Sequence, residues 1–273
     1  MALTGVTNLN HNFANNRVGG EGIGSKAGQG IYTESSTAKY ALGEKLELAD
    51  GRVFRYGYTG AAVKAGLLVA PDVSATSIGG TSGDNLVITA SGDFSPIAGS
   101  SKFQFTLGSI TANQYAGAYF QVCNDLDDGL GEGIQYRIKS NSATGATTSG
   151  KVDVELYDPI KVTMTAASDF YIQGNLYNQL IGATTTDILV AGVTPIAFTA
   201  NYYGWFQTSG IATVLMETNG TAVPAIGDNL TLGDGTTGAC QLQDSYTEPL
   251  IGIACGVGTT AAYIGVILRL GEV

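Results

Sequence analysis

The feature that most constrains the fold of this chain is a series of short stretches in which apolar and polar residues alternate. Apolar residues occupy every second position at Phe103, Phe105 and Leu107, at Ile134, Tyr136 and Ile138, at Val152, Val154 and Leu156, and at Ile160, Val162 and Met164. Successive side chains of a strand point to opposite faces, so this period predicts antiparallel strands with one buried and one solvated face. We therefore expect an all-β fold, an antiparallel β-sandwich or barrel, with little helix.

A second informative stretch, residues 202–214, contains the only tryptophan of the chain. Its Ser209-Gly210 pair predicts a tight turn that joins two antiparallel strands. Aromatic side chains are enriched both in cores and at protein interfaces, so the sequence leaves both roles open. The aromatic residues of this stretch are therefore interface candidates: Tyr202, Tyr203, Trp205 and Phe206.

The composition divides the chain into three parts. Residues 1–40 are polar, rich in glycine and without helical periodicity, which predicts an extended N-terminal arm that is ordered by contact with a partner. The arm residues that we assign to this contact are Asn8, His11, Phe13 and Arg17. Residues 76–198 are expected to form one β-domain, inserted into a second, discontinuous β-domain made of residues 41–75 and 199–273.

Charge and composition restrict the partners. The net charge is −10 and no run of Lys or Arg occurs, which argues against a nucleic-acid partner because phosphate binding needs clustered cations. No stretch reaches about 18 consecutive apolar residues and the N-terminus lacks a signal-peptide pattern, so no membrane partner is expected. The widely spaced Cys123, Cys240 and Cys255 predict buried free thiols and folding in a reducing cytoplasm. Charged residues make up only 13%, and a surface so poor in charge suits a protein covered by neighbours in a symmetric assembly.

The motifs that resemble catalytic or cofactor signatures do not have the required context. Residues 233–238, GDGTTG, match the glycine pattern of dinucleotide-binding loops, but a strand-like segment and Pro249 follow where a helix should begin. We interpret this motif as a hairpin turn. His11 is the only histidine, and no G-x-S-x-G nucleophile motif exists. The sequence therefore predicts no enzyme activity and no cofactor.

One acidic cluster is a candidate for Ca²⁺, because oxygen-rich loops bind that ion. Its members are Asp125, Asp127, Asp128 and Glu132. An EF-hand would need a ligand at the position of Leu126, so that motif is excluded. A polar turn between two strands is the favoured interpretation, and an irregular calcium site is the alternative.

A series of glycine-aromatic segments resembles a known family. The segments are ADGRVFRYGYTG, AGLLVAP, ITANQYAGAYFQV, GEGIQYRIKSN, DPIKVTM, YYGWFQTSGIATV and PLIGIACG. From about residue 40 to its end the chain is similar to virion structural proteins of tailed bacteriophages, namely capsid decoration (cement) proteins. The turn at 124–133 is longer and more acidic than the matching turn of that family.

The resemblance implies a structural role. A decoration protein binds the outer surface of the assembled head, contacts the major capsid protein and bridges neighbouring capsomers, often as a homotrimer. The expected location is then the outer capsid surface of the virion, after synthesis in the host cytoplasm. A β-rich tail, fibre or surface adhesin that binds glycans or a host receptor shares the same composition and is the alternative.

Overall fold

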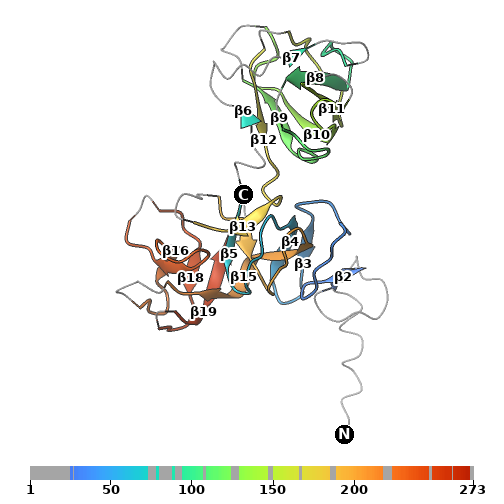
Figure 1. Ribbon diagram of the computed structural model, residues 1–273. Coiled ribbons are helices and arrows are strands. Elements are labelled where there is room, and N and C mark those ends of the chain that lie inside the picture. The colour runs from blue at the N-terminus through green and yellow to red at the C-terminus, as the bar shows by residue number, and fades with distance from the viewer. Residues whose placement is uncertain are drawn as a thin grey trace. The chain divides into compact units, whose positions relative to one another are not determined.

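The computed structural model describes residues 25–26, 28–72, 78–79, 88–89, 94–106, 109–123, 129–146, 150–165, 168–184, 189–217, 223–245, 248–259 and 261–270. They form strands, turns and irregular segments, with no helix among them, and all their named strands pair antiparallel. The prediction of an all-β antiparallel fold is confirmed for these residues. They belong to two compact units, of which unit 1 comprises the described residues up to Asp72 and from Leu176 onward, and unit 2 those between Val73 and Asn175 (Figure 1).

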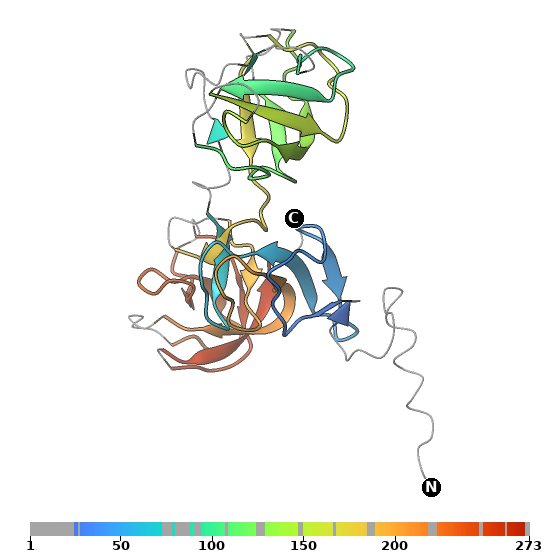
Figure 2. The same ribbon diagram turned by 45° about the vertical axis from the view of Figure 1, so that its right-hand side comes forward.

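Unit 2 is built on a seven-stranded sheet with the order β6-β12-β9-β10-β11-β8-β7. These strands are labelled in Figure 1 and seen from another side in Figure 2. Its strands are β6 (Ile78–Gly79), β7 (Ile88–Thr89), β8 (Lys102–Thr106), β9 (Tyr119–Val122), β10 (Gln135–Asn141), β11 (Lys151–Leu156) and β12 (Phe170–Gln173). Aromatic rings fill the core of this unit. Phe120 contacts Phe103 and Phe170 with ring centroids 4.7 and 5.0 Å apart, and all three are buried. The unit thus has a hydrophobic cluster of its own.

Three of the four alternating stretches are strands, namely β8, β10 and β11. The fourth prediction, a strand at 160–164, is wrong, because these residues run as an irregular segment. Ile160 and Met164 are buried as expected, but their N–H groups each donate a single bond, at 2.8 and 2.9 Å, to the carbonyls of Ser100 and Pro96. The Gly99 N–H in turn donates to the Ile160 carbonyl at 2.8 Å. These few bonds to an irregular segment hold the chain in place without the repeated pairing that makes a strand.

The polar face of the predicted strands also differs at one point from the expectation. Gln104 on β8 and Asp153 on β11 are direct cross-strand partners, and both are buried although alternation places them on the solvated face. The Gln104 amide donates a hydrogen bond to the Asp153 carboxylate. A buried polar group needs such a partner, so the pair satisfies part of its own bonding inside the unit.

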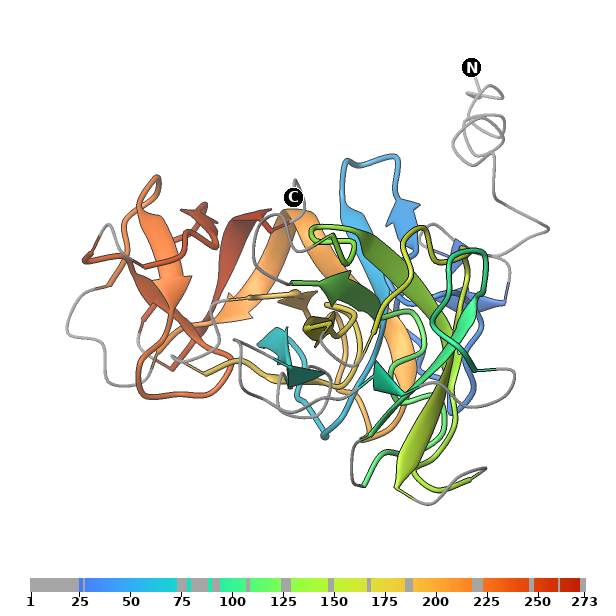
Figure 3. The ribbon, with the colours of Figure 1, turned by 90° about the horizontal axis from the view of Figure 1, so that it is seen from above.

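Unit 1 contains a ten-stranded sheet and a separate two-stranded ribbon of β1 and β2. Its strands are β1 (Ser25–Lys26), β2 (Gln29–Gly30), β3 (Lys45–Glu47), β4 (Val53–Tyr58), β5 (Leu68–Pro71), β13 (Leu180–Gly182), β14 (Gly192–Val193), β15 (Tyr203–Leu215), β16 (Asn229–Leu232), β17 (Cys240–Leu242), β18 (Gly252–Ala254) and β19 (Tyr263–Arg269). The long strand β15 is central, with β4 and β19 as partners (Figure 3).

The chain re-enters unit 1 at Leu176, whereas the sequence placed this boundary at residue 199. The reason is strand pairing. Both β13 and β14 pair with β5, so the segment that contains them adds to the sheet of unit 1. Because β13 and β14 are so short, their sequences show no alternation of apolar and polar residues that would assign them to one unit or the other.

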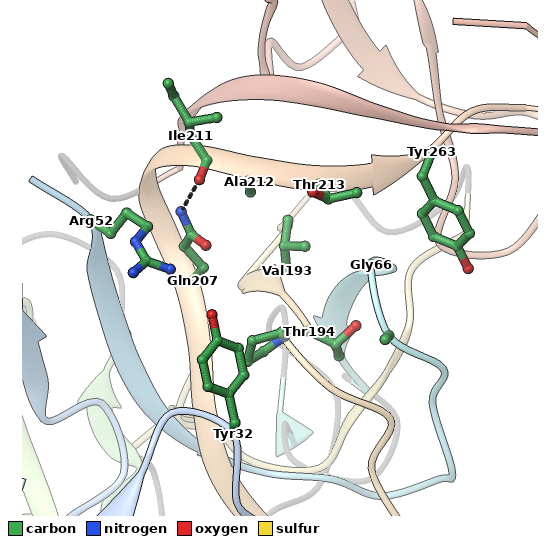
Figure 4. A pocket seen from close by; sticks show the side chains of 12 residues that line it. Tyr32, Arg52, Gly66, Val193, Thr194, Gln207, Ile211, Ala212, Thr213 and Tyr263 are labelled. Atoms are coloured by element: carbon green, nitrogen blue, oxygen red, sulfur yellow. Dashed lines mark hydrogen bonds between the residues drawn. The ribbon is translucent and has the colours of Figure 1, made fainter. Parts of the chain in front are cut away.

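The prediction of two strands joined by a tight turn at Ser209-Gly210 is wrong, because β15 is one continuous strand of 13 residues that bends there. Its first half pairs with β4 and its second half with β19, and the register shifts between Gln207 and Ser209. Gly210 has φ 83, a conformation that favours glycine. A bulge next to such a glycine bends a strand without ending its pairing, as Figure 4 shows.

The described part of the predicted arm packs against its own chain. Gln29 is buried between β4 and β15, where its side-chain nitrogen donates to the carbonyl of Tyr203 and its side-chain oxygen accepts from the hydroxyl of Tyr56. The indole nitrogen of Trp205 donates to the Gln29 carbonyl at 3.1 Å. Residues 28–40 therefore line an aromatic cluster of unit 1, while residues 1–24 lie outside the described part of the chain.

Candidate functional site

The aromatic residues of β15 lie mainly inside unit 1. Trp205 and Phe206 are each 0% exposed and belong to two different hydrophobic clusters, one on each face of the strand. The Trp205 ring meets Tyr56 edge to face, with centroids 5.0 Å apart. Tyr202 and Tyr203 are half-buried. Of the two roles that the sequence leaves open, Trp205 and Phe206 therefore serve as sheet core in the single chain.

The other predicted site residues lie largely outside the described residues. This holds for the four arm residues Asn8, His11, Phe13 and Arg17, and for the three aspartates of the acidic cluster, Asp125, Asp127 and Asp128. Glu132 is described, and its carboxylate accepts hydrogen bonds from the backbone N–H groups of Leu130 and Gly131. Backbone N–H groups from Glu132 itself and its neighbours hold the pKa of this carboxyl below its usual range. Its role in the structure is to cap its own turn.

The glycine-rich motif at 233–238 forms the hairpin connection between β16 and β17, as predicted. A buried carboxylate from another segment occupies the inside of this loop. Glu217, which is 2% exposed, accepts hydrogen bonds from the backbone N–H groups of Gly235 and Thr236 at 3.0 and 2.7 Å. The Thr236 hydroxyl adds a third bond to the same carboxylate. These loop N–H groups, which would bind phosphate in a dinucleotide site, already bind the protein's own carboxylate.

The three cysteines are free thiols, as predicted, but only Cys240 is fully buried. Burial raises the pKa of the Cys240 thiol to about 12, which keeps it protonated and unreactive. Cys123 is exposed, and Cys255 is half-buried. No group of three potential metal ligands from His, Cys, Asp and Glu occurs among the described residues.

An apolar sheet face covers the outer side of β15, β19 and β18. Ile267 is the direct cross-strand partner of both Ile211 and Ile253, so three isoleucines form a row across three strands. Tyr263 lies on the same face of β19, four residues before Ile267. We call Ile211, Ile253, Tyr263 and Ile267 the apolar sheet face. Ile211, Tyr263 and Ile267 are 62%, 51% and 41% exposed, while the opposite side of these strands is buried in the unit core.

A pocket of about 490 Å³ lies on the inner side of the bend in β15 (Figure 4). Six segments of unit 1 line it. Its polar lining residues are Tyr32, Arg52, Thr194, Gln207, Thr213 and Tyr263, and Ile211 is among the apolar ones. The bend itself is held by Gln207, whose side-chain nitrogen donates to the carbonyls of Ser209 and Ile211 at 3.1 and 2.9 Å. The same contacts that curve the strand therefore shape the pocket.

One cation stands at the edge of the pocket, and its charge is matched. The Arg52 Nε donates to the Asp50 carboxylate at 2.7 Å, and the Tyr32 side chain is a second partner of the guanidinium in its electrostatics. Burial by itself lowers the pKa of Arg52, but these two partners outweigh burial and raise that pKa. Asp50 is held in the charged state, because bonds from the backbone and side chain of Arg52 lower its pKa despite partial burial. The pocket edge is thus a neutral ion pair.

Neither surface was identified from the sequence. The apolar sheet face had a readable signal, because the outward positions of β19 are Tyr263, Gly265 and Ile267 where a half-solvated strand would carry polar residues. The pocket had none, since Tyr32, Arg52 and Gln207 are far apart in the sequence and meet only through the bend.

Comparisons with known proteins add no function to this geometry. No protein-family model matches the sequence, and neither a curated protein nor a solved structure matches the chain. Within the described residues there is no helix with the length and apolar character that a membrane crossing requires.

Proposed function

We propose that this chain is a structural virion protein that binds the outside of a phage capsid and stabilises it by bridging neighbouring capsomers. The observation that carries the proposal is the apolar sheet face, in which Ile211 and Ile267 are exposed side by side on paired strands. Contiguous exposed apolar surface on a sheet is typical of a site that a partner covers. The family resemblance supplies the kind of partner, namely the major capsid protein and sister subunits.

The remaining features agree with a role in binding. The potential phosphate loop is filled by Glu217, and the described residues contain no cluster of metal ligands. The net charge of −10 and the low content of charged residues suit large protein interfaces better than nucleic acid. Burying an apolar face of this kind in repeated, symmetric contacts stabilises a shell without any chemical step.

Cryo-electron microscopy of the particle made by the phage that encodes this chain tests the location. We expect density for the β-sheet of unit 1 on the outer capsid surface, with β15 and β19 facing a neighbouring subunit. Particles that carry the protein on the tail, or that lack it, would overturn the proposal.

The apolar sheet face itself is tested by Ile267→Asp. A carboxylate forced into a dry interface is costly, so we expect capsid occupancy to fall at least about tenfold. The matched control is Ile97→Asp in unit 2, where the side chain is also an exposed isoleucine, 54% exposed. Occupancy is measured by gel densitometry of purified particles, after circular dichroism has established that both variants fold. Equal occupancy of the two variants would contradict the role of this face.

A further inference from the structure

The pocket at the bend of β15 has the features of a site for a small ligand, and it shares Ile211 and Tyr263, but not Ile267, with the apolar sheet face. Its volume, about 490 Å³, falls in the range of roughly 300–1,000 Å³ that is usual for such sites. The walls formed by Val193 and Pro195 are apolar, and the Thr194 hydroxyl is already bonded to the Lys64 carbonyl at 2.7 Å. The pocket lining thus combines apolar walls with polar side chains.

The most informative of these groups is the side chain of Gln207. It is 5% exposed, and its amide nitrogen donates to the carbonyls of Ser209 and Ile211. Its amide oxygen has no hydrogen-bond partner among the described residues and points into the pocket (Figure 4). This oxygen is available to accept a hydrogen bond from a ligand that donates one.

Two tyrosines flank the pocket at its mouth. Tyr32 is 60% exposed and Tyr263 is 51% exposed, and their rings lie at opposite ends of the cavity in Figure 4. Aromatic rings with an apolar face and a polar hydroxyl suit ligands that combine the same two properties. The C–H faces of a sugar ring pack on such a ring, while its hydroxyls bind the phenol oxygens and amides around it.

The charges around the pocket favour a neutral ligand over an anionic one. Arg52 is the one cationic residue among those that line the pocket, and Asp50 neutralises it at 2.7 Å. A guanidinium has five N–H donors, so Arg52 can still donate to a neutral oxygen while it remains paired with Asp50. An anionic ligand would gain little from a matched ion pair and would be repelled by a chain of net charge −10.

We propose that this pocket binds a neutral saccharide, with Gln207 and Arg52 bonding its hydroxyls and Tyr32 and Tyr263 packing on its ring faces. This proposal is tested separately from the capsid role at Ile267, which belongs to the apolar sheet face and does not line the pocket, whereas Ile211 and Tyr263 belong to both. An extended neutral peptide is the competing occupant, and it is included in the test as a separate outcome.

The full-length protein is first tested on an array of neutral and acidic glycans. Binding to maltotriose, lactose, N,N′-diacetylchitobiose, sialyllactose and a neutral hexapeptide is then measured by isothermal titration calorimetry. We expect at least one neutral saccharide to bind with Kd of about 1 mM or tighter. Tyr32→Ala and Tyr263→Ala should each weaken this binding at least about fivefold, since each removes one ring contact.

The matched control is Tyr157→Ala in unit 2, because Tyr157 is 59% exposed and Tyr32 is 60% exposed. This control should bind as wild type does. The proposal would be overturned if the array retained no neutral glycan, or if only the acidic glycan or the peptide bound. It would also be overturned if Tyr32→Ala and Tyr157→Ala bound the saccharide with equal affinity. Ile267→Asp should keep saccharide binding while it loses capsid occupancy, so that the two proposals fail separately.

Discussion

Two buried polar side chains in unit 1 each satisfy several groups from distant segments. The side chain of Gln29 bonds the carbonyls of Thr33 and Tyr203, each at 2.9 Å, and the hydroxyl of Tyr56 at 2.7 Å. The Glu217 carboxylate likewise accepts a hydrogen bond from the backbone N–H of Gly235 in the loop that joins β16 and β17. A polar group left buried without its partner costs about 1–3 kcal/mol, so each of these residues fixes the position of a whole segment.

A buried tyrosine in unit 2 gives a pH-dependent prediction at the same scale. Tyr115 is 2% exposed, and burial raises the pKa of its hydroxyl from 10.0 to about 12. A raised pKa contributes stability that is present below pH 10 and is lost as the pH rises toward 12. We therefore expect wild-type stability to fall in this alkaline window, with Tyr115 contributing at most about 3 kcal/mol.

Tyr115→Phe keeps the ring and removes the titrating group. Its stability should fall less between pH 9 and pH 12 than that of wild type, measured by urea unfolding at each pH. Stability at pH 7 serves as the reference, since the hydroxyl is neutral there in both folded and unfolded chains. Parallel pH profiles for the two proteins would show that this hydroxyl does not carry the effect.

At the scale of elements, β15 determines the architecture of unit 1. A single strand serves both β4 and β19 because it bends between its two halves. Its alternate side chains enter different clusters, with Trp205 on one face and Phe206 on the other. The bend also places Gln207 and Ile211 on two sides of one pocket. One irregularity therefore positions the core, the apolar sheet face and the pocket.

The bend depends on glycine at position 210. A Cβ at Gly210 would lie 3.0 Å from the Cα of Arg52, and φ is +83°. Gly51 has nearly the same φ, +85°, with nothing within 4 Å of such a Cβ. Alanine at either site incurs about 1–2 kcal/mol of backbone strain, and Gly210→Ala adds a clash with backbone atoms.

We expect Gly51→Ala to lower the free energy of unfolding by about 1 kcal/mol and Gly210→Ala to lower it by about 3 kcal/mol or more. Urea unfolding of the two variants gives the comparison directly. The pocket provides a second readout, because Gly210→Ala should also weaken saccharide binding while Gly51→Ala should not. Equal destabilisation would mean that the strand relaxes around the added methyl group.

At the scale of the molecule, each unit has its own hydrophobic clusters. Unit 2 is built around one cluster of buried residues that includes Phe103, Phe120 and Phe170. The three further clusters contain residues of unit 1 alone. A compact unit with a separate core meets the physical requirement for folding by itself.

Excision of residues 73–175 tests this independence. We expect the fragment to unfold cooperatively in urea, with an m-value of about 1–3 kcal/mol per molar urea, as is usual for a small domain. Its far-ultraviolet circular dichroism should show β-structure without helix. A fragment that unfolds gradually, without a transition, would indicate that its core needs the rest of the chain.

The candidate sites were predictable from the sequence only in part. The hairpin at 233–238 follows from local composition and spacing, and the structure confirms it, whereas only Cys240 of the three predicted buried free thiols is fully buried. The outward positions of Tyr263 and Ile267 in the sequence of β19 indicated an apolar surface, although only the pairing with Ile211 joins them into one face. The pocket required contacts between segments that no local pattern links.

By itself the sequence determined the all-β class and the strands β8, β10 and β11, because alternation is a property of neighbouring residues. Only the tertiary structure decided that residues 160–164 stay irregular, that Gln104 and Asp153 are buried together, and that β15 bends instead of turning back. These outcomes depend on which distant strand supplies each hydrogen bond. Local periodicity fixes which side chains share a face, whereas the free energy of long-range pairing and packing selects the partner of that face.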